Sequence, residues 1–189
     1  LARHQLGVNF GTLIGHGTLR RDVMGDSISE ASEDELDRMK LLLKESLEAG
    51  AFGLSFGLAF SHGRPAARYE LISLATFVAT HKKLVAIHMR DEGRGFLSSV
   101  AESIDIARSS GANLEISHLK AIGTKAWQDT PAALDMIKTA RQEGLSIHAD
   151  VFPYLRTGSL LYMLLPEWVR EGGKEAIMAK LHSPQERSQ

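Results

Sequence analysis

Two histidines end two short, mostly apolar runs of the sequence, thirty positions apart. His88 closes the run LVAIH and His118 closes LEISH, and each is followed two residues later by a cation, Arg90 and Lys120. Short apolar runs of this kind are typical of buried strands. Because side chains alternate along a strand, each histidine shares a face with the cation that follows it.

If these strands are parallel neighbours, they lie about 4.8 Å apart and both imidazoles emerge at the same end of the sheet. Two ring nitrogens at that spacing can converge on one zinc ion, to which imidazole binds at about 2.0–2.1 Å. The alternative is that each is a hydrogen-bonded structural histidine. Their matched positions favour a metal site held by His88 and His118. Arg90 and Lys120 then point toward a bound substrate and suit a carboxylate.

Other polar residues near the strand ends carry weaker signals. Asp91 and Glu92 could orient a ligand or pair with a nearby arginine, and we retain Asp91 as a candidate catalytic carboxylate. Tyr154 can offer a phenol to a developing oxyanion or pack beside Pro153. Asp150 could hydrogen-bond to a histidine of the neighbouring strand or be a buried structural residue.

Two further histidines have more ordinary interpretations. His16 ends the first apolar run and could face the same end of the sheet, although GHGTLR also fits a loop turn. His148 lies near the start of its strand, where a structural role is more common than a catalytic one.

The strands that carry these residues alternate with helices along the chain. Apolar runs predict strands at 8–16, 52–60, 84–91, 114–120 and 145–154. Amphipathic patterns predict helices at 33–51, 67–81, 98–111 and 130–144, and a broken helical tail at 159–182. In the first helix, Ser32 and Glu35 form a plausible capping box. Strands and helices that alternate in this way favour right-handed βαβ units and a parallel sheet.

Both a (β/α)8 barrel and an open doubly wound sheet use such units. The first strand is not followed by the G-x-G-x-x-G fingerprint of dinucleotide-binding sheets, which favours the barrel. A closed barrel needs eight strands in about 200–250 residues. The sequence therefore predicts an α/β chain, a single domain over residues 1–189, that forms a partial (β/α)8 TIM-type barrel of about five βα units with parallel strands.

The composition is that of an ordinary globular protein: 189 residues, 43% hydrophobic and 24% charged, with a net charge of −1. Such a charge offers no electrostatic footprint for nucleic acid or an anionic membrane. No run of about 18 apolar residues predicts a transmembrane helix. Without cysteine, a metal must be held by His, Asp or Glu. We expect a cytoplasmic location, and a homo-oligomer could form through the open barrel edges.

Six motifs, in order, resemble those of the N-acyl-D-amino-acid deacylases (D-aminoacylases) of the metal-dependent amidohydrolase superfamily. They are GHGTLR, EAGAFGLSFGL, HMRDE, ISHLK, DVFPY and LPEWVREGG. The resemblance implies a (β/α)8 barrel that holds zinc. It also implies hydrolysis of a small-molecule N-acyl-D-amino acid to a carboxylate and a free D-amino acid.

The same resemblance implies roles for individual residues. It makes His88 and His118 the metal ligands. It places Arg90 and Lys120 around the substrate, with Lys120 the better candidate for binding the substrate carboxylate. Tyr154 occupies a position similar to the one that polarises the scissile carbonyl in the family.

The chain also departs from the family pattern. The H-x-H motif of the first strand, the metal-binding cysteine and the late aspartate that acts as ligand and general base are absent, and Phe60 and Phe152 stand where tyrosines are common. The chain therefore resembles only the central part of the family. Two histidines fall short of the three protein ligands usual at catalytic zinc, so we expect the chain alone to be inactive or nearly so.

Three other interpretations remain open at this point. The chain could be a non-catalytic α/β barrel remnant that self-associates through its open edges. It could be an amidohydrolase that acts on cyclic amides. An aldolase-like barrel with Lys120 as Schiff-base nucleophile is the least favoured, because it gives the paired histidines no role.

Overall fold

The structure is a computed structural model that describes residues 7–156, 158–170 and 172–188. Five parallel strands form one sheet in the order β1-β2-β3-β4-β5. They are β1 Ile14–Gly15, β2 Gly53–Gly57, β3 Leu84–His88, β4 Asn113–Ile116 and β5 Ile147–Ala149. Each strand lies beside its neighbour in the chain, whereas a doubly wound sheet reverses its order at a switch point. The prediction of a partial (β/α)8 barrel with five βα units is therefore confirmed.

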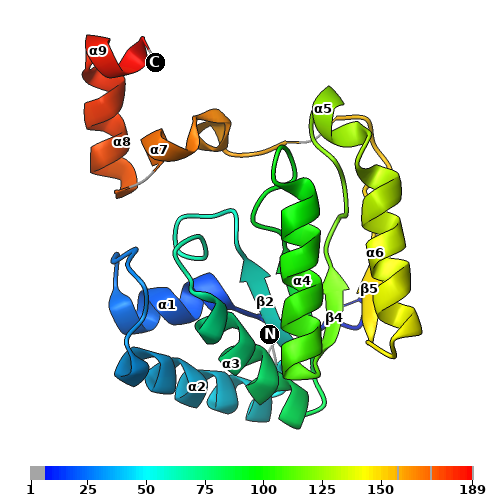
Figure 1. The fold of residues 1–189 in the computed structure, drawn as a ribbon. Coiled ribbons are helices and arrows are strands. Elements are labelled where there is room, and N and C mark those ends of the chain that lie inside the picture. The colour runs from blue at the N-terminus through cyan, green and yellow to red at the C-terminus, as the bar shows by residue number, and fades with distance from the viewer. Residues whose placement is uncertain (1–6, 157, 171, 189) are drawn as a thin grey trace.

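Helices connect the strands and cover one face of the sheet (Figure 1). They are α1 His16–Met24, α2 Glu33–Glu48, α3 Arg68–Thr80, α4 Phe96–Ser110, α5 Thr124–Trp127 and α6 Thr130–Gln142. Helix α3 packs against α4, and α4 packs against α6. The chain continues through η1 Leu161–Leu164, α7 Glu167–Arg170, α8 Gly173–His182 and α9 Pro184–Arg187. Helices α8 and α9 lie apart from the βα units in Figure 1.

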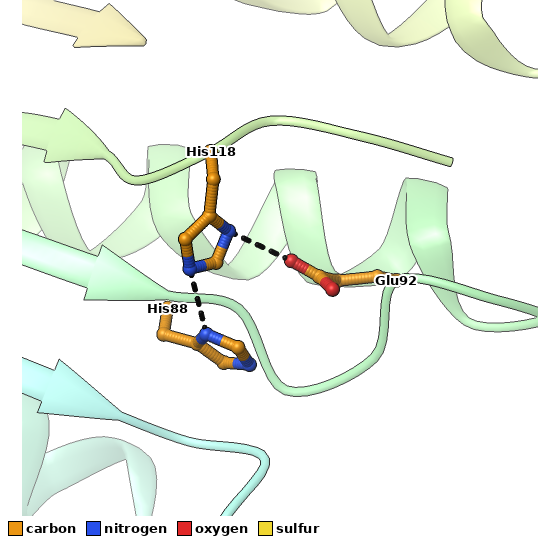
Figure 2. Close-up of side chains that lie close together, drawn as sticks. All are labelled: His88, Glu92 and His118. Carbon is orange, nitrogen blue, oxygen red and sulfur yellow. Dashed lines mark hydrogen bonds and ion pairs between the residues drawn. The ribbon is translucent and has the colours of Figure 1, made fainter. Parts of the chain in front are cut away.

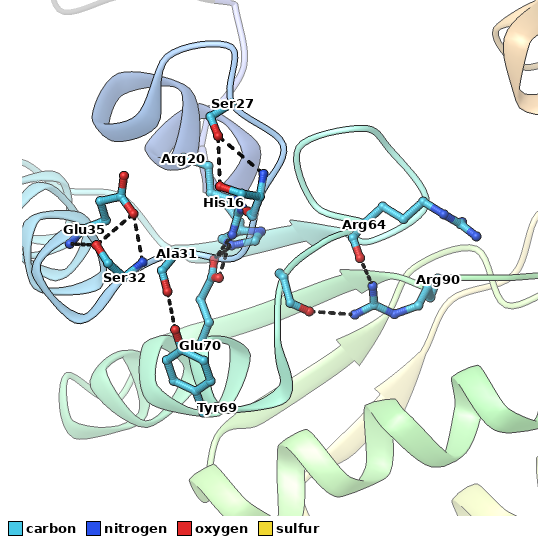
Figure 3. Close-up of polar contacts among 12 residues, drawn as sticks. His16, Arg20, Ser27, Ala31, Ser32, Glu35, Arg64, Tyr69, Glu70 and Arg90 are labelled. Atoms are coloured by element: carbon cyan, nitrogen blue, oxygen red, sulfur yellow. Dashed lines mark hydrogen bonds and ion pairs between the residues drawn. The ribbon is translucent and has the colours of Figure 1, made fainter. Parts of the chain in front are cut away.

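The hydrophobic core lies between the strands and the helices. Helix α2 shows how it is built, since its apolar stripe of Leu36, Met39, Leu43 and Leu47 is fully buried. Ser32 Oγ accepts a hydrogen bond from the backbone N–H of Glu35, and the Glu35 carboxylate accepts one from the backbone N–H of Ser32 (Figure 3). The predicted capping box is thus confirmed, and it sets where the buried stripe begins.

The opposite face of the sheet is more polar. Ser55, Ala86, Glu115 and His148 are register partners across β2 to β5, alternating with strand residues that are buried beneath the helices. In the described part of the chain, β1 and β5 pair with no strand beyond the sheet and not with each other, so the sheet is open. No described helix combines the length and the apolar character needed to cross a bilayer.

The two outer strands are shorter than predicted. The run at 8–16 contributes only Ile14–Gly15, because α1 begins at His16, and the run at 145–154 contributes only Ile147–Ala149. Among residues 7–156, 158–170 and 172–188, each of these strands pairs with one neighbour, so each has half the ladder hydrogen bonds that hold a central strand. The predicted helical tail is present in pieces, interrupted where Gly172 and Gly173 adopt φ angles of 89° and 79° that favour glycine.

Candidate metal centre

The two histidines singled out in the sequence come together at one end of the sheet. His88 is the last residue of β3, and His118 lies two residues beyond the end of β4, its parallel neighbour. His88 Nδ1 is 2.9 Å from His118 Nε2, and the ring centroids are 4.6 Å apart. The rings are edge-on to one another, with an interplanar angle of 74°, and these two nitrogens point toward each other (Figure 2). Their assignment as metal ligands stays a prediction.

A carboxylate completes the cluster. Glu92, only 8% exposed, places Oε1 3.1 Å from His118 Nδ1. The His88, Glu92 and His118 side chains each offer one ligand atom, and these atoms lie within 4.8 Å of one another. The ring of His118 thus uses both nitrogens, Nε2 toward His88 and Nδ1 toward Glu92 (Figure 2). Two imidazoles and a carboxylate are a donor set that suits zinc.

The electrostatics favour a neutral imidazole at His88. Burial is the largest influence and lowers its pKa; the charge of Glu92 opposes this, and the nearby His118 and Lys120 add smaller lowering effects. A neutral imidazole keeps a free lone pair, which metal binding requires. The ring also packs against Phe60, with the centroids 4.8 Å apart.

Lys120 lies at the cluster, as the sequence led us to expect. Its Nζ is 2.7 Å from Glu92 Oε1 and 3.0 Å from His118 Nδ1. Arg90 is placed differently. Its guanidinium donates to Glu102 Oε1 at 2.8 Å and to Ala66 O at 3.3 Å. It also donates to the carbonyl oxygen of Arg64 (Figure 3).

Arg90 therefore ties the loop between β2 and α3 to helix α4. These partners occupy the guanidinium, so the geometry lends no support to Arg90 as a substrate-binding residue.

The two predicted catalytic residues also lie elsewhere. Asp91 Oδ1 accepts a hydrogen bond from the backbone N–H of Gly93 at 2.6 Å, in the turn that precedes α4. Tyr154 is 71% exposed beyond β5, with its ring edge-on to Phe152 at 5.3 Å between centroids. The structure does not bring Asp91 or Tyr154 to the histidine pair among the contacts of the described residues, so their catalytic roles stay predictions.

His16 belongs to a separate buried cluster. Its Nε2 lies 2.7 Å from Glu70 Oε1, and Arg20 Nη1 donates to Glu70 Oε2 at 2.6 Å, all three side chains being fully buried (Figure 3). Burial lowers the pKa of His16, so the ring is neutral and donates its Nε2 proton to the carboxylate. His16 is the first residue of α1 and not part of a loop turn, and these contacts support a structural role for it rather than one at the metal centre.

The sequence does not reveal two features, one in the buried His16 cluster and one in the metal centre. The charged partners of His16, which are Arg20 and Glu70, fall at helix positions that resemble ordinary solvent-facing ones. The sequence identifies Glu92 only as an orienting or salt-bridge residue, and no spacing rule joins it to His118. The nearest available signal was that it follows the strand-end His88 within the same turn.

No protein-family model matches the chain. An N-acyl-D-glutamate deacylase of Alcaligenes xylosoxydans xylosoxydans is 34% identical over 154 residues, which are 82% of this chain and 32% of that protein. A D-aminoacylase of the same organism is 31% identical over 156 residues, again 82% of this chain and 32% of that protein. The predicted resemblance to the N-acyl-D-amino-acid deacylases is confirmed. The chain spans about a third of the length of the curated deacylases it matches.

Solved deacylase structures agree with this result. The N-acyl-D-glutamate deacylase of Bordetella bronchiseptica, crystallised with zinc and a phosphonate mimic of the tetrahedral intermediate, superposes with a TM-score of 0.76 at 35% identity, covering 78% of this chain and 31% of that one. A D-aminoacylase that defines a subset of amidohydrolases superposes with a TM-score of 0.72 at 32% identity, covering 76% of this chain and 30% of that one. D-Aminoacylase has a binuclear metal centre.

Proposed function

We propose that this chain is the central, metal-holding part of a zinc-dependent amidohydrolase that cleaves N-acyl-D-amino acids to a carboxylate and a free D-amino acid. The observation that carries the proposal is the meeting of the His88 and His118 rings at the ends of neighbouring parallel strands. The likeness to deacylases at 31–34% identity supports the substrate class.

His88 Nδ1 and His118 Nε2, the nitrogens that face one another, would hold the zinc ion. When bound, zinc lowers the pKa of water toward about 7 and polarises a carbonyl oxygen. With zinc held at Nε2, the Nδ1–H of His118 would donate a hydrogen bond to Glu92 Oε1, 3.1 Å away. Such a carboxylate fixes the tautomer and the ring orientation of a metal-binding histidine. This agrees with the expectation that an acidic residue after His88 orients a ligand.

Lys120 is our candidate for the residue that binds the substrate carboxylate. Its ammonium group lies 2.7 Å from Glu92 Oε1 and 3.0 Å from His118 Nδ1, so a substrate carboxylate that takes the place of Glu92 would pair with it beside the metal ligands. Holding the substrate there converts a chance encounter with the reacting groups into a fixed geometry. The catalytic role of Tyr154 and the substrate-binding role of Arg90 are proposed on the family resemblance and on their strand-end positions, and the catalytic role of Asp91 on its position just past His88.

We further propose that these 189 residues alone hydrolyse little substrate. The described residues bring two imidazoles and one carboxylate together, and that carboxylate is engaged by Lys120. Catalytic zinc usually has three protein ligands.

Zinc uptake tests the proposal directly. The purified chain is titrated with zinc against a chromophoric chelator, alongside His88→Ala, His118→Ala and the control His148→Ala, an exposed histidine on β5. We expect the wild type and the control to bind zinc alike, and each of the first two variants to lose at least about 10–100-fold in affinity. Equal zinc uptake by the wild type and His88→Ala would contradict the proposal.

A second proposal concerns assembly. Beyond the open edge at β5, Val151, Leu155 and Leu161 are 74%, 106% and 81% exposed. An unpaired strand edge next to exposed apolar side chains favours association with another chain. We therefore propose that the isolated chain self-associates. Light scattering that shows a monomer over a wide concentration range would refute this proposal.

A further inference from the structure

Asp150 follows β5 directly and lies beside the end of β4. Three hydrogen bonds join it to the segment that carries His118. Its backbone N–H donates to Ile116 O at 3.2 Å, and its carbonyl oxygen accepts from the N–H of Leu119 at 2.9 Å. Its side-chain Oδ1 accepts from the backbone N–H of His118. Asp150 thus binds peptide groups before, at and after the histidine.

His118 needs such support because of its backbone conformation. Its φ is 42°, and the only other described non-glycine residue with a positive φ is Lys82. For a residue with a side chain, this left-handed region costs about 1–2 kcal/mol. A strained backbone of this kind persists only where the surrounding structure holds it. The bond from Asp150 satisfies the N–H of the strained residue itself.

The left-handed backbone conformation of His118 places its ring between His88 and Glu92. In this conformation Nε2 lies 2.9 Å from His88 Nδ1 and Nδ1 lies 3.1 Å from Glu92 Oε1 (Figure 2). If the backbone relaxed to negative φ, the Cα–Cβ bond would turn and the ring would leave this position. Because Asp150 is not one of the three residues whose ligand atoms cluster among the described residues, any effect on the metal passes through His118.

We propose that Asp150 is a positioning residue of the metal centre, whose carboxylate oxygen holds His118 in its left-handed conformation so that the ring meets His88. The inference rests on the proposed function, since it concerns the grip of the histidine pair on zinc. What matters in Asp150 is an acceptor oxygen within hydrogen-bond reach of the backbone N–H of His118. The negative charge of its carboxylate is secondary.

Three substitutions separate these properties. Asp150→Ala removes the acceptor, and we expect zinc affinity to fall about 10–100-fold, the usual effect of losing a residue that supports a metal ligand. Asp150→Asn keeps an oxygen at the same place without the charge, and should bind zinc nearly as tightly as the wild type. Asp150→Glu keeps the charge but displaces the oxygen, and should resemble the alanine variant. Asp135→Ala, an exposed aspartate on α6, is the matched control.

The measurement is zinc affinity of the full 189-residue chain by chelator competition, with circular dichroism used to confirm that each variant is folded at the assay temperature. A purely structural role would lower the melting temperature without lowering the zinc affinity of the folded chain. If the alanine variant does not fold, the asparagine and glutamate variants decide the question between them.

Each outcome has a definite meaning. Rescue by asparagine but not by glutamate supports the inference. Wild-type affinity in the alanine or glutamate variant, or equal weakening of the asparagine and glutamate variants, overturns it while leaving the proposed function intact. Failure of the wild-type chain to bind zinc overturns the proposed function itself and this inference with it.

Discussion

The buried cluster of His16, Arg20 and Glu70 makes a quantitative prediction about stability. Glu70 accepts hydrogen bonds from both other side chains, and all three are fully buried. In Glu70→Gln the guanidinium of Arg20 stays buried without its counter-charge. Removing one partner of a buried ion pair costs about 3–5 kcal/mol. For a chain of this length that loss corresponds to a melting temperature lower by about 6–20 °C.

The assay is urea unfolding followed by circular dichroism, comparing midpoints at unchanged slope. Asp105→Asn is the matched control, because it removes the carboxylate from another arginine pair, Arg68–Asp105, in which the side chains are 66% and 38% exposed. Solvent screens such a pair, so its loss should change the midpoint little. Equal destabilisation by Glu70→Gln and Asp105→Asn would refute the reasoning.

Three further predictions concern pH, a close backbone contact and the substrate. Burial lowers the pKa of His16 below its ordinary 6.5, so the unfolded chain binds more protons than the folded chain below that pH. The free energy of unfolding should therefore fall as pH drops below about 6.5. In His16→Gln the dependence of the free energy of unfolding on pH, measured from urea midpoints at several pH values, should become weaker. Gly63→Ala would place its Cβ 2.1 Å from the carbonyl oxygen of Gly57 and should lower the melting temperature, whereas Gly158→Ala, which meets nothing within 4 Å, should not. In an active full-length deacylase that carries this segment, Lys120→Met should raise KM for N-acetyl-D-glutamate more than it lowers kcat, and an unchanged KM would contradict a role for Lys120 in holding the carboxylate.

The periodicity of the chain predicts the strand and helix order well, because burial on one face imposes the spacing of apolar residues seen in α2 and in the central strands. The convergence of His88 and His118 follows from the same logic, since parallel neighbours end at one edge of the sheet. The pattern does not predict which partners long side chains contact. Arg90 shares a strand-end position with Lys120, yet it turns to Glu102 and two carbonyl oxygens, while Lys120 turns to Glu92.

The backbone details are equally hidden from the sequence. Nothing in the run LEISHLK marks His118 as left-handed, because the conformation is held by Asp150, thirty-two positions away in the chain. The lengths of β1 and β5 depend on whether a further strand pairs with them, which a local pattern does not encode. Local chemistry therefore identifies the candidate ligands, and long-range contacts determine how they are presented.

In the described sheet every strand pairs only with its neighbours in the chain, so local unfolding should begin at the outer strands β1 and β5. Asp150, which directly follows the outer strand β5, carries the carboxylate that accepts a hydrogen bond from the backbone N–H of His118. Local unfolding of β5 would therefore separate the imidazoles of His118 and His88 while the central strands are still paired. A further strand or a second molecule that pairs with the free edge of β5 would therefore stabilise Asp150 and increase the metal affinity of the distant histidine pair.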